Sequence, residues 1–170
     1  MISDKFNLLF FLFLTTVFSQ QKISVEAIYS GQFQAKGMAE LQSMKNTNQY
    51  TVLNLDKASQ SLQIDLFDFA TLKKVSTLID TKNHSELVNG IDSYTFSPDE
   101  KKILIANNTN SIYRHSFTAD YFLYNIENKE LIKILEQVQE PVFSPDGKKI
   151  AYVKDNNIFI SPIYDGKISH

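Results

Sequence analysis

Short runs rich in β-branched and aromatic residues, separated by polar turn residues, make up most of the chain after residue 45. Runs of about four to eight such residues, bounded by Asn, Asp, Gly or Pro, indicate β-strands. The clearest runs are Gln49–Leu55, Ser61–Asp68, Lys74–Ile79, Asp120–Ile126, Leu131–Leu135 and Asn157–Ser161. Residues Met38–Ser43 instead predict a short helix with a polar face. The pattern therefore predicts an all-β fold preceded by one helical segment.

One hairpin unit occurs twice. Phe96–Ala106 aligns with Phe143–Val153 at an offset of 47 residues, and each copy contains Ser-Pro-Asp, two lysines and an apolar run. The proline presets the backbone for a tight turn, and Gly147 supplies a position with positive φ in the second copy. Glu100 occupies the equivalent position in the first copy. We therefore expect the first turn to be strained or of a different type.

The spacing of this repeat indicates the architecture. Residues 49–79 form an earlier, degenerate unit with the same alternation of strand and turn. Units of about 40–50 residues with about four antiparallel strands are typical of β-propeller blades, although a β-sandwich with an accidental repeat is the alternative. About two and a half to three blades fit in the chain, whereas propellers close with about four to eight. We therefore expect a partial β-propeller from the N-terminal part of a longer protein, with a blade-swapping oligomer as the alternative.

Residues 1–19 have the layout of a secretory signal peptide. Lys5 precedes the apolar stretch Phe6–Leu14, and Ser19 ends a segment suited to cleavage. The apolar stretch is shorter than the about 20 residues that a transmembrane helix needs, so an uncleaved anchor is the less favoured alternative. We expect cleavage after Ser19 and export of residues 20–170, the N-terminal part of a propeller domain, to the periplasm or the medium.

Composition removes several classes of function. Seventeen basic and 19 acidic residues give a net charge of −2 over 170 residues, so no net field attracts nucleic acid. The absence of cysteine excludes disulfides, thiolate metal sites and cysteine nucleophiles. The three histidines, His84, His115 and His170, are not at metal-ligand spacing, and the sequence contains no Gly-x-Ser-x-Gly motif. We therefore assign no catalytic residue, metal site or cofactor and expect no turnover by this chain alone.

Several segments resemble a known family. Gly31-Gln32-Phe33, Met38–Leu53 and Ser111–Ile126 are similar to the N-terminal propeller of dipeptidyl peptidase IV, in the prolyl oligopeptidase family of serine peptidases. The resemblance covers nearly all of residues 23–170. The Ser-Pro-Asp-Gly hairpin recurs in many propellers, whereas the run Tyr113–Tyr121 (Tyr-Arg-His-Ser-Phe-Thr-Ala-Asp-Tyr) is much more specific.

This resemblance implies an eight-bladed propeller that limits access to a C-terminal α/β-hydrolase domain. That domain carries a Ser-Asp-His triad and releases N-terminal dipeptides with proline or alanine in second position. The implied partners are a peptide substrate with a free N-terminus, the hydrolase domain and a second copy in a homodimer. Arg114 is implied to bind a carbonyl oxygen of the substrate, with His115 as its structural neighbour.

The match to the family is incomplete. The adjacent glutamates that hold the substrate's α-ammonium in the family are not identifiable in this chain, because Glu136 and Glu140 are four residues apart and Glu127 and Glu130 lie in a turn. The alternative function is a non-catalytic periplasmic propeller that binds other proteins.

Overall fold

The computed structural model describes residues 24–31, 33, 41–164 and 167–168. The chain divides into two compact units, Met1–Met38 and Ala39–His170. In the first unit, helix α2 spans Val25–Tyr29, and the Ser24 hydroxyl caps it by accepting a hydrogen bond of 3.1 Å from the Ala27 amide. The predicted signal peptide lies outside the described residues. Within the described ranges, no helix is long and apolar enough to cross a membrane.

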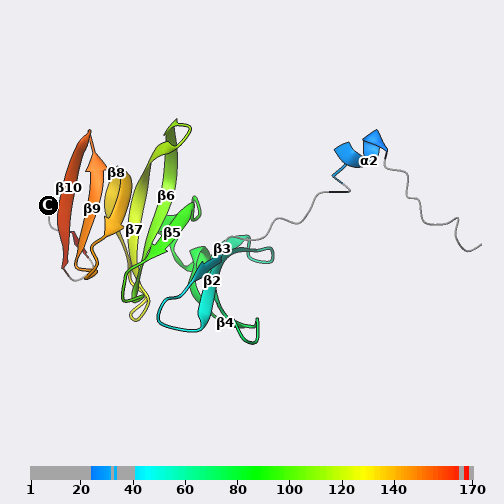
Figure 1. Ribbon diagram of the computed structural model, residues 1–170, viewed down its shortest axis with the longest axis horizontal. Coiled ribbons are helices and arrows are strands. Elements are labelled where there is room, and N and C mark those ends of the chain that lie inside the picture. Colours follow the sequence, from blue (N-terminus) through cyan, green and yellow to red (C-terminus); the bar gives the residue numbers. More distant parts are fainter. Residues whose placement is uncertain (1–23, 32, 34–40, 165–166, 169–170) are drawn as a thin grey trace, which may run out of the picture. The chain divides into compact units, whose positions relative to one another are not determined.

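The second unit consists of antiparallel strands that follow one another in the order of the sequence (Figure 1). A four-stranded sheet contains β1 (Leu41–Ser43), β2 (Gln49–Asp56), β3 (Ser61–Asp68) and β4 (Lys74–Asp80). Two 3-10 turns, Thr81–Asn83 and Ser85–Leu87, lie in the connection to the next sheet. That sheet contains β5 (Ser93–Phe96), β6 (Lys102–Tyr113), β7 (Ser116–Asn125), β8 (Leu131–Phe143), β9 (Lys149–Lys154), β10 (Asn157–Tyr164) and β11 (Lys167–Ile168).

Strand β8 is shared between two groups of strands. Residues 131–138 pair with β7, and residues 139–143 pair with β9. Gln137 and Glu140 have φ angles of 49° and 47°, so the strand changes direction where it changes partner. The chain therefore forms three antiparallel groups of four strands. We call them blade 1 (β1–β4), blade 2 (β5–β8) and blade 3 (β8–β11).

Blade 2 is buried on both faces. Along β6, Ile103 and Ile105 belong to an apolar cluster shared with blade 1, whereas Leu104 and Ala106 belong to a cluster shared with blade 3. Strand β7 divides its side chains in the same way. Burial on both faces explains why these strands read as continuous apolar runs rather than as alternating ones. The predicted all-β partial propeller is confirmed, with sheets stacked face to face as blades.

The two Ser-Pro-Asp turns have the same internal hydrogen bonds. Ser97 Oγ donates to Asp99 and Ser144 Oγ donates to Asp146, each at 2.6 Å. Each serine hydroxyl also accepts a bond of 2.9 Å from the amide of the lysine that begins the next strand. The bonds from the serine hydroxyls, with those from the Lys101 and Lys148 backbone amides, lower the pKa of both aspartate carboxyls. The repeat in the sequence therefore specifies a local structure that needs no distant partner.

Glu100 adopts the backbone conformation of the glycine that it replaces. Its φ is 57°, compared with 66° at Gly147, so the first turn is strained rather than of a different type. The Glu100 carboxylate accepts hydrogen bonds from the Lys45 and Asn46 amides, in the β1–β2 turn of blade 1, the second at 3.1 Å. A glycine offers no such acceptor. The residue that breaks the repeat therefore ties blade 2 to blade 1.

The helix predicted over Met38–Ser43 is wrong for the part that the structure describes. Residues 41–43 form β1, in which Leu41 pairs with Val52. A helix of six residues is too short to be stable in water, whereas the edge of β2 offers backbone partners. Gln42 Nε2, in the side chain, also donates to the Tyr94 backbone carbonyl at 2.8 Å, which fixes β1 against blade 2.

Candidate functional site

The β6–β7 hairpin extends beyond its neighbouring strands (Figure 1). Strand β5 pairs with β6 only as far as Ala106, and β8 pairs with β7 only as far as Ala119. Residues 110–118 therefore form a two-stranded ribbon whose described strand partners are each other, through pairs such as Asn110 with Thr118. We call this segment the ribbon.

Arg114 and His115 occupy the tip of the ribbon. Both are exposed, as is Tyr113, whose exposed fraction is 79%. Among the described residues, the Arg114 guanidinium has no hydrogen-bond or ion-pair partner, and neither has the His115 ring. The structure therefore places the two predicted residues next to each other at a turn, with no bond between them. The guanidinium is free to bind a ligand.

A buried carboxylate lies at the root of the ribbon. Asp120 on β7 is only 6% exposed and accepts hydrogen bonds from Asn108 Nδ2 at 3.1 Å and from the backbone amide of Gln137 at 3.1 Å. Lys133 Nζ lies 3.1 Å from its second oxygen. Burial raises the pKa of the Asp120 carboxyl, but the bonds from Asn108, Gln137 and Lys133 outweigh it, and the pKa lies below its ordinary value. Asp120 therefore stays ionised at neutral pH.

Gln137 connects this carboxylate to the ribbon itself. Its Nε2 donates to Asp120 at 3.0 Å, while its Oε1 accepts from Asn110 Nδ2 and Thr118 Oγ1, each at 2.8 Å. The register of β6 shifts between Asn107 and Asn110, and Asn108 has a φ of 55°. The root is therefore a bulge held by side-chain bonds to Gln137 and Asp120, and Asp92 also accepts bonds from the Thr109 backbone amide and hydroxyl, at 3.0 and 2.6 Å.

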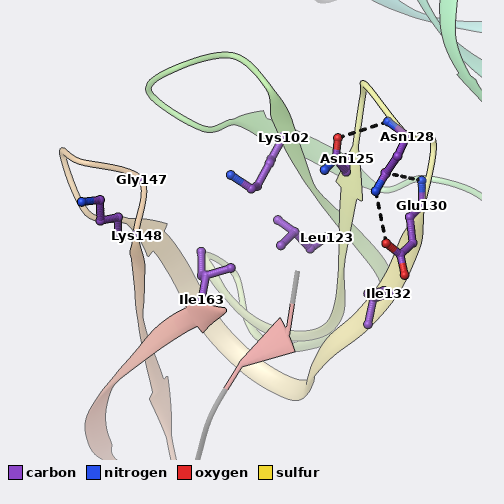
Figure 2. A pocket seen from close by; sticks show the side chains of 9 residues that line it. All are labelled: Lys102, Leu123, Asn125, Asn128, Glu130, Ile132, Gly147, Lys148 and Ile163. Atoms are coloured by element: carbon purple, nitrogen blue, oxygen red, sulfur yellow. Dashed lines mark hydrogen bonds between the residues drawn. The ribbon is translucent and has the colours of Figure 1, made fainter. Parts of the chain in front are cut away.

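A hollow lies at the ends of β6 and β7 that are opposite to the ribbon. It has a volume of about 410 Å³, and its wall includes Lys102, Leu123 and Ile163. Figure 2 shows the Lys102 side chain pointing into this hollow, with Asn128 and Glu130 on the far side. Asn128 Nδ2 already donates to Glu130 at 3.3 Å. We assign no function to this hollow.

The sequence analysis identified residues at the tip of the ribbon but none at its root. Arg114 and His115 came from the family resemblance. Asp120 carried a weaker signal, since it is a single acidic residue within the otherwise apolar run Ala119–Leu123. His84 stacks edge-on against Tyr124, with ring centroids 5.6 Å apart, so it packs as part of the structure. In the described part of the chain, no three His, Cys, Asp or Glu side chains are grouped as metal ligands.

Comparison with known proteins links this sequence to a family. The model of the family described as the dipeptidyl peptidase IV (DPP IV) N-terminal region matches residues 97–170, which include the ribbon and its root. The chain is 34% identical over 88 residues to dipeptidyl peptidase 4 of Felis catus, a match that covers 50% of this chain and 12% of that protein. It is 40% identical over 70 residues to dipeptidyl aminopeptidase B of Saccharomyces cerevisiae, covering 41% of this chain and 9% of that protein.

A solved structure extends the likeness to the fold. The crystal structure of Porphyromonas gingivalis dipeptidyl peptidase 4 superposes with a TM-score of 0.68 at 29% identity, over 87% of this chain and 22% of that one. The chain spans about a tenth of the length of the Felis catus and Saccharomyces cerevisiae relatives. The chain therefore resembles the dipeptidyl peptidase IV N-terminal region, and the family match lies over residues 97–170.

Proposed function

We propose that this chain is the N-terminal propeller part of an exported, dipeptidyl peptidase IV-like serine peptidase. The full-length enzyme would release N-terminal dipeptides with proline or alanine in second position. In this proposal the propeller limits access to the active site and helps to bind the substrate peptide. The matched residues 97–170 and their relatives among dipeptidyl peptidases support the proposal.

Arg114 is the proposed substrate-binding residue. The observation that carries this assignment is an exposed guanidinium, without a partner among the described residues, at the tip of a ribbon with a bonded root. A guanidinium stays charged at any working pH and presents several donors in a fixed plane, which suits a peptide carbonyl oxygen. Holding that oxygen would orient the peptide for attack and so contribute to the rate. His115 would support the turn rather than transfer protons.

The chemistry of bond cleavage would come from elsewhere in the full-length protein. The sequence contains no Gly-x-Ser-x-Gly elbow. The proposal therefore includes a C-terminal α/β-hydrolase domain as partner and a homodimer as the assembly. It also includes export directed by residues 1–19.

The test is hydrolysis of an Xaa-Pro chromogenic substrate by the full-length gene product. Arg114→Ala should lower kcat/KM by roughly ten- to a thousandfold, the range for losing a charged hydrogen-bonding contact. Arg114→Lys keeps the charge but loses the planar donor set, and it should recover only part of the activity. Lys101→Ala removes an exposed cation from a turn at the opposite end of β6 and should act like wild type.

Two results would contradict the proposal. If Arg114→Ala melts and cleaves like wild type, Arg114 is a surface residue without a substrate role. If the full-length protein does not cleave Xaa-Pro substrates at all, the non-catalytic binding module becomes the better reading.

A further inference from the structure

The ribbon needs support at its root because a two-stranded ribbon has little stability of its own. An isolated two-stranded hairpin is marginally stable in water. From Asn110 to Arg114 the ribbon is about 13 Å long at about 3.3 Å per residue. A tilt of about 10° at the root would therefore move the tip by about 2 Å, and a misplacement of about 1 Å can cost a hundredfold in rate.

We propose that Asp120 is a positioning residue for Arg114, acting through Gln137 to fix the direction of the ribbon. This inference rests on the proposed function of Arg114. The Asp120 carboxylate bonds to the β6 bulge through Asn108 and to the bend of β8 through both nitrogens of Gln137. Gln137 in turn bonds both strands of the ribbon, at Asn110 and Thr118.

The chemistry of this root favours a positioning role over a ligand site. Both oxygens of Asp120 are used, one by Gln137 and the other by Asn108 and Lys133. Its side chain is only 9% exposed, so a substrate has little access to it. Asn108 comes from β6, whereas Gln137 and Lys133 come from β8. The carboxylate therefore holds three strands together at the point where the ribbon separates from the sheet.

Asp120→Asn is the informative variant because it keeps the shape of the side chain. The new amide group would face donors where the carboxylate oxygen accepted bonds, so the root should loosen. Asp65→Asn is a matched control in blade 1. Asp65 is 4% exposed, and it accepts bonds from Asn54 at 3.0 Å and from Lys74 at 2.7 Å, far from the ribbon in sequence.

The first readout is the rate at which trypsin cuts the Arg114–His115 bond in the full-length protein, followed by mass spectrometry. This readout does not depend on catalysis. Asp120→Asn should raise the rate about tenfold, as expected for losing hydrogen bonds to a buried charge. Asp65→Asn should leave the rate unchanged even where it lowers the melting temperature. An unchanged cutting rate in Asp120→Asn would overturn the proposal.

The second readout is kcat/KM on an Xaa-Pro substrate in a double-mutant cycle with Arg114→Ala. Asp120→Asn alone should lower kcat/KM by roughly ten- to a hundredfold, and in the Arg114→Ala background by less than about twofold. Equal losses in both backgrounds, or a loose ribbon with normal activity, would overturn the positioning role. If Arg114→Ala keeps wild-type activity, the proposed function fails and the substrate role of Asp120 fails with it. The trypsin result alone then decides whether Asp120 fixes the ribbon.

Discussion

The Glu100 carboxylate provides a quantitative test of how blade 1 is attached to blade 2. We consider Glu100→Gly, which restores the residue found in the second copy of the repeat. A non-glycine residue at a φ of 57° costs about 1–2 kcal/mol, and glycine removes that cost. The same change deletes the acceptor for the Lys45 and Asn46 amides.

The lost hydrogen bonds and the glycine entropy together outweigh the relieved strain. Bonds to a charged group contribute about 1.5–3 kcal/mol each when buried, but Glu100 is half-exposed and solvent reduces this to about 1 kcal/mol each. Glycine also increases the entropy of the unfolded chain, at a cost of about 0.5–1 kcal/mol. Glu100→Gly should therefore lower the free energy of unfolding by about 0.5–2 kcal/mol.

Gln60→Gly is the matched control for the backbone effect. Gln60 has a φ of 54°, and its side chain bonds only the Lys57 carbonyl in its own turn, at 2.7 Å. Strain relief there is offset by glycine entropy and by the loss of one exposed hydrogen bond worth about 0.5 kcal/mol, leaving the free energy of unfolding within about 1 kcal/mol of wild type. The difference between the two variants isolates the contact between blades.

Hydrogen exchange of residues 44–48, with urea unfolding of the same proteins, measures both effects. In Glu100→Gly, the Lys45 and Asn46 amides should exchange about 2–30 times faster, which corresponds to about 0.5–2 kcal/mol. Gln60→Gly should leave these amides unchanged. If both variants shift stability equally, or if the two amides keep wild-type exchange rates, Glu100 does not hold blade 1.

Two further predictions concern pH and the exposed face of blade 3. Because the pKa of the Asp120 carboxyl lies below its ordinary value of about 3.9, its stabilisation is complete above that pH and is lost as pH falls through the folded-state pKa. The stability gap between wild type and Asp120→Asn, measured with urea, should therefore narrow from about pH 6 to about pH 3, and a constant gap would contradict this. On β10, Ile158 and Ile160 are 77% and 67% exposed, and we expect this apolar face to make the 170-residue chain self-associate. Ile160→Glu should change the free energy of unfolding by less than about 0.5 kcal/mol but reduce that self-association in sedimentation velocity. Undiminished self-association would show that this face is not responsible.

The repeat predicted the blades well because its turn chemistry is local. The sequence predicted the structure less well where pairing between residues distant in the sequence determines it. The strand predicted over Leu131–Leu135 continues to Phe143, since the bulge around Pro141 marks a change of partner rather than an end. The same limit applies to the ribbon root, where Asp120 and its partners meet only through register shifts that periodicity does not encode. Arg114 was found by resemblance, because an exposed arginine on a turn has no pattern of its own.

The two joints between blades differ in mechanical terms. Blades 2 and 3 share the backbone of β8, so rotating one against the other must bend a strand that is hydrogen-bonded to both. Blades 1 and 2 are linked by residues 81–92, by their shared apolar cluster and by side-chain contacts such as those of Gln42 and Glu100, but they share no strand. A force pulling on the chain would therefore meet a weaker coupling after blade 1 than after blade 2. Blade 1 would detach by itself, whereas blades 2 and 3 would yield together.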